Sequence, residues 1–176
     1  MHCGEVTILE KKLLLLGLLL SQDMHGYQLN EMLQHNPGMP ISVKKSNAYK
    51  LLNDMETDGW VTYQEEQQGN RPVRRVYTIT DRGETAFYQL LRENLSTSPL
   101  PEFPGAVGLD FVAMLPAEEV VTLLEQRYQR IEARFKELDE LSREIRESHL
   151  SVGYLYFFYS SELQWLGEVI NRLHSA

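Results

Sequence analysis

The sequence predicts a mainly α protein with one β-hairpin, divided into an N-terminal domain of residues 1–95 and a helical C-terminal domain of residues 109–176. Apolar residues recur at helical spacing through most of the chain. One pair of β-prone segments, at residues 60–65 and 73–79, encloses turn-forming residues. Residues 96–108 hold three prolines and two glycines, which predicts a connector between the two domains.

Composition places the chain among ordinary globular proteins. Of its 176 residues, 43% are hydrophobic and 24% are charged, which leaves enough apolar side chains for a core. The single cysteine, Cys3, excludes an intrachain disulfide and a CxxC metal framework. A cytoplasmic location is therefore the expectation.

The first predicted helix spans residues 7–21. Thr7 and Glu10 have capping-box spacing, and the segment LLLLGLLL that follows is apolar on nearly every side, so the helix should be buried. A signal peptide is the alternative, but Glu5 and Glu10 occupy the segment that should be cationic. The apolar run is also too short to span a bilayer, so we expect no membrane association.

Two further helices are predicted in the first domain. After a turn over residues 22–26, a weaker apolar stripe predicts a short helix that ends before Pro37. Four apolar residues at i, i+3, i+4 and i+7, counted from Ala48, predict a third helix that ends at Gly59.

A β-hairpin and a fourth helix complete the first domain. The β-prone segments are joined by QQGNRP, whose Gly-Asn and Pro residues favour a turn. We expect Arg71, Arg74 and Arg75 to project from this flexible loop. The fourth helix should begin at Thr80 or Asp81 and carry apolar residues on one face.

The net charge of −8 opposes binding to nucleic acid at long range, but the charge is unevenly distributed. Residues 1–95 carry 10 basic and 12 acidic residues, a net charge of −2, whereas residues 96–176 carry 7 and 13, a net charge of −6. Basic residues of the first domain cluster at the start of the third helix and on the hairpin. The residues expected to contact DNA are Lys44, Lys45, Ser46, Asn47, Tyr49, Lys50, Arg71, Arg74 and Arg75.

Three helices followed by a hairpin, with cations at these two places, is the order of a winged helix-turn-helix domain. A helix can enter the major groove of DNA, and a hairpin can reach the neighbouring backbone or minor groove. The lysines and Asn47 are expected to position or read DNA in the major groove. Ser46 and Tyr49 are expected to bind phosphate, and the arginines to act from the hairpin, or wing.

Three segments resemble the signature blocks of the PadR family of bacterial transcriptional regulators: LLLLGLLLSQDMHGYQL, SNAYKLLNDMETDGWV and NRPVRRVYTITDRG. The third block, with Arg75, Tyr77, Thr80 and Gly83 in order, is the most diagnostic. The resemblance covers residues 8–95. It implies a winged-helix dimer that represses transcription and releases DNA when a small molecule, often an aromatic one, binds.

The C-terminal domain is expected to hold a short helix over residues 109–115, a long helix from Pro116 to about Ser148 and a final helix over residues 152–173. Apolar residues of the long helix alternate between steps of four and three, the spacing of a coiled-coil seam. Such helices need partners, so we expect a homodimer and, by its two-fold symmetry, a palindromic DNA target. The residues expected at the dimer interface are Leu124, Tyr128, Ile131, Phe135, Leu138, Leu155, Tyr159, Leu166, Ile170 and Leu173.

Aromatic residues crowd the start of the final helix. Tyr154, Phe158 and Trp165 are the candidates to line a pocket for a small aromatic effector, because flat ligands stack on such rings. The alternative is that these residues form dimer core, since an aromatic stripe at helical spacing is typical of packing.

The sequence contains no catalytic or cofactor pattern. The five histidines show no HExxH or other metal-ligand spacing, and there is no GxSxG, P-loop or GxGxxG motif. We therefore expect neither an enzyme nor a resident metal or cofactor.

Together these features predict a homodimeric, ligand-responsive transcriptional regulator, with repression as its expected action, that binds double-stranded DNA. The alternative is a winged-helix protein-interaction module that has lost DNA binding. The overall acidity and two glutamates in the wing, Glu65 and Glu66, favour that alternative. A third interpretation is a small-molecule sensor that binds no operator DNA.

Overall fold

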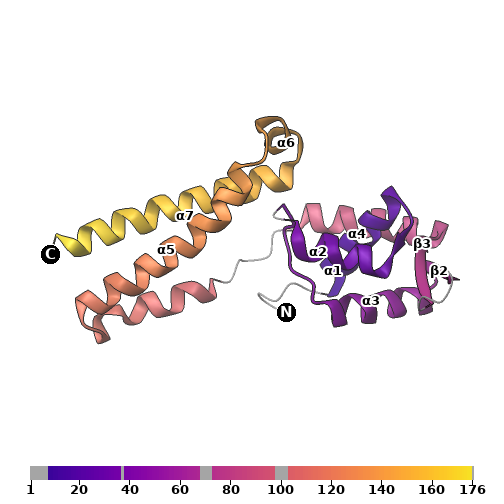
Figure 1. Ribbon diagram of the computed structural model, residues 1–176, viewed down its shortest axis with the longest axis horizontal. Coiled ribbons are helices and arrows are strands. Elements are labelled where there is room, and N and C mark those ends of the chain that lie inside the picture. Colours follow the sequence, from indigo (N-terminus) through magenta and orange to yellow (C-terminus); the bar gives the residue numbers. More distant parts are fainter. Residues whose placement is uncertain (1–7, 37, 68–72, 98–102, 176) are drawn as a thin grey trace. The chain divides into compact units, whose positions relative to one another are not determined.

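The computed structural model describes residues 8–36, 38–67, 73–97 and 103–175 (Figure 1). The chain divides into two compact units. The first comprises Met1–Asn36 with Ile41–Pro101, and the second comprises Pro37–Pro40 with Glu102–Ala176. Each unit has a hydrophobic cluster of its own.

The first unit contains four helices and a small antiparallel sheet among its described residues. Its elements are α1 (Ile8–Ser21), β1 (Met24–His25), α2 (Gly26–His35), α3 (Lys45–Thr57), β2 (Val61–Glu66), β3 (Arg74–Ile79) and α4 (Asp81–Ser96). The predicted order of three helices, hairpin and fourth helix is confirmed. The capping role predicted for Thr7 lies outside the described residues.

The turn predicted over residues 22–26 is wrong in one respect. Met24 and His25 form the short strand β1, which pairs antiparallel with β3, opposite Tyr77 and Val76, and gives the strand order β1-β3-β2. Two residues are too few to show the alternating pattern of a strand, so only the tertiary pairing reveals β1. The strand places His25 at the start of α2 and beside the wing.

The core of the first unit lies where α1, α3 and the sheet meet. Leu15 and Leu16 of α1 are fully buried, and Leu52 and Met55 of α3 are at most 1% exposed. These residues confirm the predicted buried face of α3 and the predicted burial of the first helix. The start of α1 differs, because Ile8 and Leu9 are exposed. The packing fixes the helix axis, so the opposite face of α3 must be directed to solvent.

Two turns hold α3, the wing and α4 in register. Gly59 follows α3 with φ +71°, a left-handed conformation that favours glycine. Thr80 caps α4: its hydroxyl accepts a hydrogen bond from Gly83 N and donates to Gly59 O at 2.8 Å. One side chain therefore ties the end of α3 to the start of α4.

We expect Thr80→Ala to lower the free energy of unfolding by about 1–2 kcal/mol, because the helix cap and the bond to Gly59 are both lost. Urea unfolding of the full chain measures this change. Thr80→Ser is the matched control and should retain most of the stability, since it keeps the hydroxyl. Equal losses in the two variants would contradict the capping role.

The second unit is built from helices. Its elements are the 3₁₀ helix η1 (Pro104–Met114) and the α-helices α5 (Ala117–Asp139), α6 (Arg143–Ser148) and α7 (Leu150–His174). η1 corrects two predictions: regular structure starts at Pro104, inside the predicted connector, and it is not the short α-helix expected over residues 109–115. Proline is suited to this first position because its φ is already helical.

The single long helix predicted from Pro116 to about Ser148 is also wrong. The chain breaks between α5 and α6, where Ser142 caps α6 by accepting a hydrogen bond from Ile145 N. The Arg146 guanidinium donates to the carbonyl oxygens of Asp139 and Leu141, at the end of α5. These local bonds satisfy the helix ends, so the apolar spacing does not need to continue through them.

α5 and α7 run side by side in opposite directions, with α6 at the turn between them (Figure 1). Leu124 of α5 and Leu166 and Ile170 of α7 are buried in the cluster that joins the two helices. The partner of the α5 seam is therefore α7 of the same chain. No helix among the described residues is long and apolar enough to cross a membrane.

Candidate nucleic-acid interface

The start of α3 presents cations and polar groups to solvent. Lys44 is the residue before the first turn, and Lys45, Ser46 and Asn47 follow it, all exposed. No side chain caps this end by a hydrogen bond, and its first turn holds no acidic residue. Because a helix N-terminus carries partial positive charge, lysines there repel it and a negatively charged partner would stabilise both.

The exposed face of α3 continues one turn at a time along Ser46, Lys50 and Asn53. This face lies opposite the buried residues of the same helix. Asn53 is absent from the predicted contacts, although its spacing of three residues from Lys50 is the signal that would have found it. An asparagine on such a face can donate to and accept from the edge of an adenine base.

Arg74 and Arg75 lie in strand β3 and do not project from a flexible loop as predicted. β2 and β3 pair in register from Val61 and Ile79 out to Glu66 and Arg74. Backbone pairing therefore fixes Arg74 and Arg75, and both side chains are exposed. Arg71 lies outside the described residues.

Arg75 is held by the residues around it. Its guanidinium carbon lies 4.2 Å from the centre of the Tyr63 ring, and its Nε lies 3.6 Å from Glu65 Oε1. A hydrogen bond to the Tyr77 side chain is the main cause that raises the pKa of Arg75, with Tyr63 and Glu65 adding to it. Arg75 is therefore oriented by the wing, and part of its charge is balanced there.

The acidic residues of the wing face its cations. Glu65 is the register partner of Arg75, and Glu66 is the register partner of Arg74. The Glu66 carboxylate also lies 3.9 Å from His25 Nε2. The glutamates that make the first wing strand acidic are thus placed against basic groups of the same unit.

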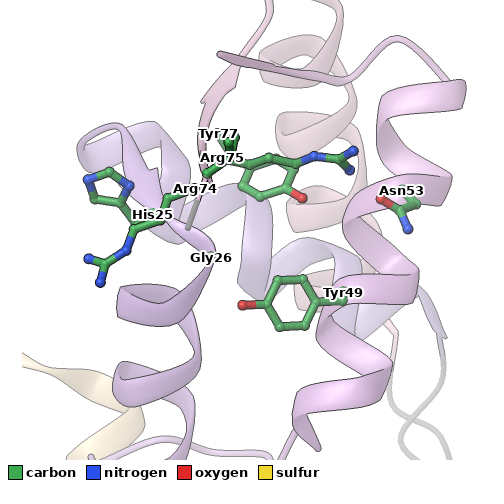
Figure 2. A pocket seen from close by; sticks show the side chains of 8 residues that line it. His25, Gly26, Tyr49, Asn53, Arg74, Arg75 and Tyr77 are labelled. Atoms are coloured by element: carbon green, nitrogen blue, oxygen red, sulfur yellow. The ribbon is translucent and has the colours of Figure 1, made fainter. Parts of the chain in front are cut away.

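A pocket of about 520 Å³ opens between α3, β3 and the junction of β1 with α2 (Figure 2). Figure 2 shows the Arg74 guanidinium beside His25 and the Arg75 guanidinium on the side of Asn53. The residues that line the pocket are His25, Gly26, Tyr49, Asn53, Val73, Arg74, Arg75 and Tyr77. The pocket brings Tyr49 of α3, a predicted DNA contact, together with two arginines of the wing that are distant in sequence. The lysines at the start of α3 are not among the residues that line it.

Gly26 determines where Tyr49 lies in this pocket. A Cβ atom at Gly26 would stand 2.8 Å from Tyr49 Cε1 and 3.2 Å from its hydroxyl oxygen. The ring can therefore rest against the first residue of α2 only because that residue is glycine. Sequence reasoning places Gly26 in a turn and gives it no contact with α3.

Residues 15–89 match the model of the transcriptional regulator PadR-like family. This part of the chain is a PadR-like domain. The match confirms the resemblance noted in the sequence, and the PadR-like domain takes in all three helices that precede the wing, apart from the first turns of α1, as well as the wing itself.

The similarity to known proteins extends beyond the PadR-like domain. The negative transcriptional regulator PadR of Bacillus subtilis (strain 168) is 25% identical over 130 residues, 72% of this chain and 70% of that protein. A crystal structure of Bacillus subtilis PadR in complex with operator DNA has a TM-score of 0.77 at 20% identity and covers 92% of this chain and 96% of that one. Another, with p-coumaric acid, has a TM-score of 0.72 at 19% identity, covering 96% and 99%. These matches confirm the expected mainly α fold of the chain.

The residues predicted for dimerisation are used largely within one chain. Leu124, Leu138, Leu166 and Ile170 are buried, and the other six are half-buried: Tyr128, Ile131, Phe135, Leu155, Tyr159 and Leu173. The aromatic residues suggested for an effector lie on the opposite, exposed face of α7: Tyr154, Phe158 and Trp165. None of these three lines the pocket beside the wing.

Proposed function

We propose that this chain is a homodimeric, ligand-responsive repressor that binds palindromic operator DNA through α3 and the wing. The observation that carries the proposal is the pocket in which Tyr49 and Asn53 of α3 meet Arg74 and Arg75 of β3. DNA contacts need a helix that fits the major groove and cations that reach the phosphates beside it. The negative regulator PadR and its operator complex support this assignment by similarity.

We assign base contacts to the exposed face of α3 and phosphate contacts to its first turn and to the wing. Lys44, Lys45, Asn47 and Lys50 keep the roles expected from the sequence, and Asn53 joins them. Ser46 and Tyr49 bind phosphate, as do Arg74, Arg75 and Arg71. The acidic surface of the second unit stays away from DNA because like charges repel.

We also propose that the second copy packs on the exposed face of α7. Tyr154 and Phe157 there are 70% and 71% exposed, and Trp165 continues the same face. Aromatic side chains of this size are seldom left in water in such a group, and they are enriched at interfaces between proteins. A dimer sets two α3 helices at the spacing of successive major grooves, about 34 Å.

An aromatic effector is proposed for the same region because flat rings stack on tyrosine, phenylalanine and tryptophan. The structure of a similar PadR with p-coumaric acid supports this class of ligand. Quenching of Trp165 fluorescence by planar aromatic acids, coupled to a loss of DNA affinity, tests the assignment. Quenching without any change in DNA affinity would favour the sensor interpretation.

Fluorescence anisotropy with random duplexes and with duplexes selected by the protein from a random library tests the proposed function. Salt-sensitive binding to both, with much tighter binding to selected palindromic duplexes, is the expected result. Failure to bind either duplex at low salt would instead support the protein-interaction module. The titration at two salt concentrations separates phosphate contacts from base contacts.

We expect Arg74→Ala to weaken binding to every duplex and to reduce the slope of log affinity against log salt by about one unit. The reason is that one phosphate contact is lost while base contacts remain. Arg92→Ala is the matched control, since Arg92 is an exposed arginine of α4 in the same unit. An unchanged slope in Arg74→Ala would contradict the wing assignment.

Glu65→Gln should have the opposite effect. The Glu65 carboxylate lies 3.6 Å from the Arg75 guanidinium and competes with phosphate for its charge. We expect the variant to bind random duplexes severalfold more tightly and with a steeper salt slope, because an acidic group is removed from the wing. Anisotropy at low and moderate salt measures both changes. Weaker binding by Glu65→Gln would show that the carboxylate aids DNA contact by orienting Arg75.

A further inference from the structure

The pocket beside the wing has the lining of a phosphate site. Tyr49 contributes a hydroxyl donor, and Arg74 and Arg75 contribute guanidinium groups. Arginine binds phosphate oxygens with two parallel N–H groups, and charge-assisted hydrogen bonds of this kind are shorter and stronger than neutral ones. None of the described residues that line the pocket is acidic.

The position of the pocket relates it to the exposed face of α3. Asn53 both lines the pocket and continues the line of Ser46 and Lys50 on the helix. A DNA strand that borders a groove occupied by α3 would therefore pass over the mouth of the pocket. A backbone phosphate is the negatively charged group that such a strand presents at regular intervals.

The two arginines of the pocket differ in their surroundings. Arg75 is stacked on Tyr63 and faces Glu65, so its charge is shared within the wing. Arg74 lies at the other side of the pocket, beside His25, and the Tyr49 ring reaches from α3 toward the start of α2 (Figure 2). Tyr49 and Arg74 reach the pocket from α3 and from β3, so a phosphate bound by both would join the helix to the wing, while Arg75 is held in place by Tyr63 and Glu65.

Gly26 controls this geometry from outside the DNA-contacting elements. The Tyr49 ring rests on Gly26, and a Cβ there would come within 2.8 Å of Cε1. The atom in the way belongs to a side chain, so Gly26→Ala can be accommodated by displacing the Tyr49 ring while the backbone keeps its path.

We infer that this pocket binds one phosphate of a DNA strand through Tyr49 and Arg74, and that Gly26 positions the Tyr49 hydroxyl for that contact. The inference rests on the proposed DNA binding and adds a single-phosphate contact shared by α3 and the wing. Recognition helix and wing would then be linked through one DNA group, so neither could shift along the duplex alone.

The test uses the full-length protein and a duplex that it selects from a random library. Single phosphates along one half-site are replaced, one at a time, by uncharged methylphosphonates, and affinity is measured for wild type, Tyr49→Phe and Gly26→Ala. At one phosphate position, the methylphosphonate should weaken wild-type binding about tenfold. At the same position it should weaken binding of Tyr49→Phe and of Gly26→Ala by less than about fivefold. Arg74→Ala should lose sensitivity at the same position.

Three controls separate the possible results. Arg92→Ala should keep the wild-type profile at every position, because Arg92 lies on α4 and does not line the pocket. If the effects of Tyr49→Phe and of the methylphosphonate simply add at every position, the inference is overturned while the proposed function stays intact. Failure of the wild type to select any duplex would instead overturn the proposed function.

Free inorganic phosphate has the same chemistry as a DNA phosphate and is the other possible occupant of the pocket. Inorganic phosphate is added at constant ionic strength, and its effect on duplex binding is compared between wild type and Tyr49→Phe. Equal, small effects on the two proteins support a DNA phosphate in the pocket. Selective displacement of DNA from the wild type would assign the pocket to a free phosphate and overturn the inference.

Discussion

Replacing Gly83 with alanine should destabilise the first unit more than any other exchange considered for this chain. A Cβ atom at this position would lie 1.9 Å from Trp60 O and 2.8 Å from Trp60 C, both backbone atoms. Alanine improves helix propensity by about 1 kcal/mol relative to glycine. Relief of the overlap requires α4 to move away from the start of β2, at a cost of about 3 kcal/mol or more. The steric cost exceeds the gain, so we expect net loss of stability.

Hydrogen exchange of α1 and α3 in Gly83→Ala measures this loss, because both helices belong to the first unit. Gly108→Ala is the matched control: nothing lies within 4 Å of its added Cβ, and its exchange should equal that of the wild type. Protection of α1 and α3 within about 1 kcal/mol of the wild-type value in Gly83→Ala would contradict the prediction.

Phe157→Glu should convert the proposed dimer into monomers. The Phe157 side chain is 71% exposed on α7, so the exchange leaves the internal packing of α5 and α7 intact. In a dimer the new carboxylate would be buried without a partner, which costs several kcal/mol. A monomer engages one half-site, so operator affinity should fall about a hundredfold or more.

Light scattering and anisotropy on the same samples measure the two consequences of Phe157→Glu. Gln126→Glu adds the same charge at an exposed position of α5 and should change neither the mass nor the affinity. Circular dichroism should be the same for both variants and the wild type. A dimeric Phe157→Glu would show that the second copy packs elsewhere, and a monomeric wild type would remove the dimer from the proposed function.

The fold of the first unit is largely predictable because each signal is local. Leu51 and Leu52 fall on one helical face, Gly59 ends that helix, and Thr80 caps the next one. The hairpin boundaries agree with the prediction to within one residue. β1 escapes prediction because its two residues become a strand only by pairing with β3.

The second unit is less predictable because its patterns allow more than one partner. The seam on α5 requires an apolar surface opposite, and a second copy satisfies that requirement as well as α7 of the same chain. The break before Ser142 depends on a cap and on Arg146, whose guanidinium bonds the carbonyl groups five and seven residues before it. Apolar periodicity carries no information on such bonds.

The candidate site combines residues that sequence reasoning found separately. Tyr49 of α3 and the arginines of the wing are predicted from separate segments, but their meeting at one pocket depends on the packing of three elements. Asn53 was detectable from helical spacing. The contact between Gly26 and Tyr49 was not detectable, because no sequence pattern near either residue indicates that they pack together. A Cβ atom at Gly26 would lie only 2.8 Å from the Tyr49 ring.

The pairing of Glu65 with Arg75 bears on how such a protein would search a genome. A chain with a net charge of −8, whose wing cations face carboxylates, gains little from random duplex and should dissociate from it quickly. Each encounter would then scan only a short stretch before release, and most copies would be free in solution. The concentration of free protein would then follow the number of copies in the cell. Modest changes in expression would therefore change the occupancy of the operator directly.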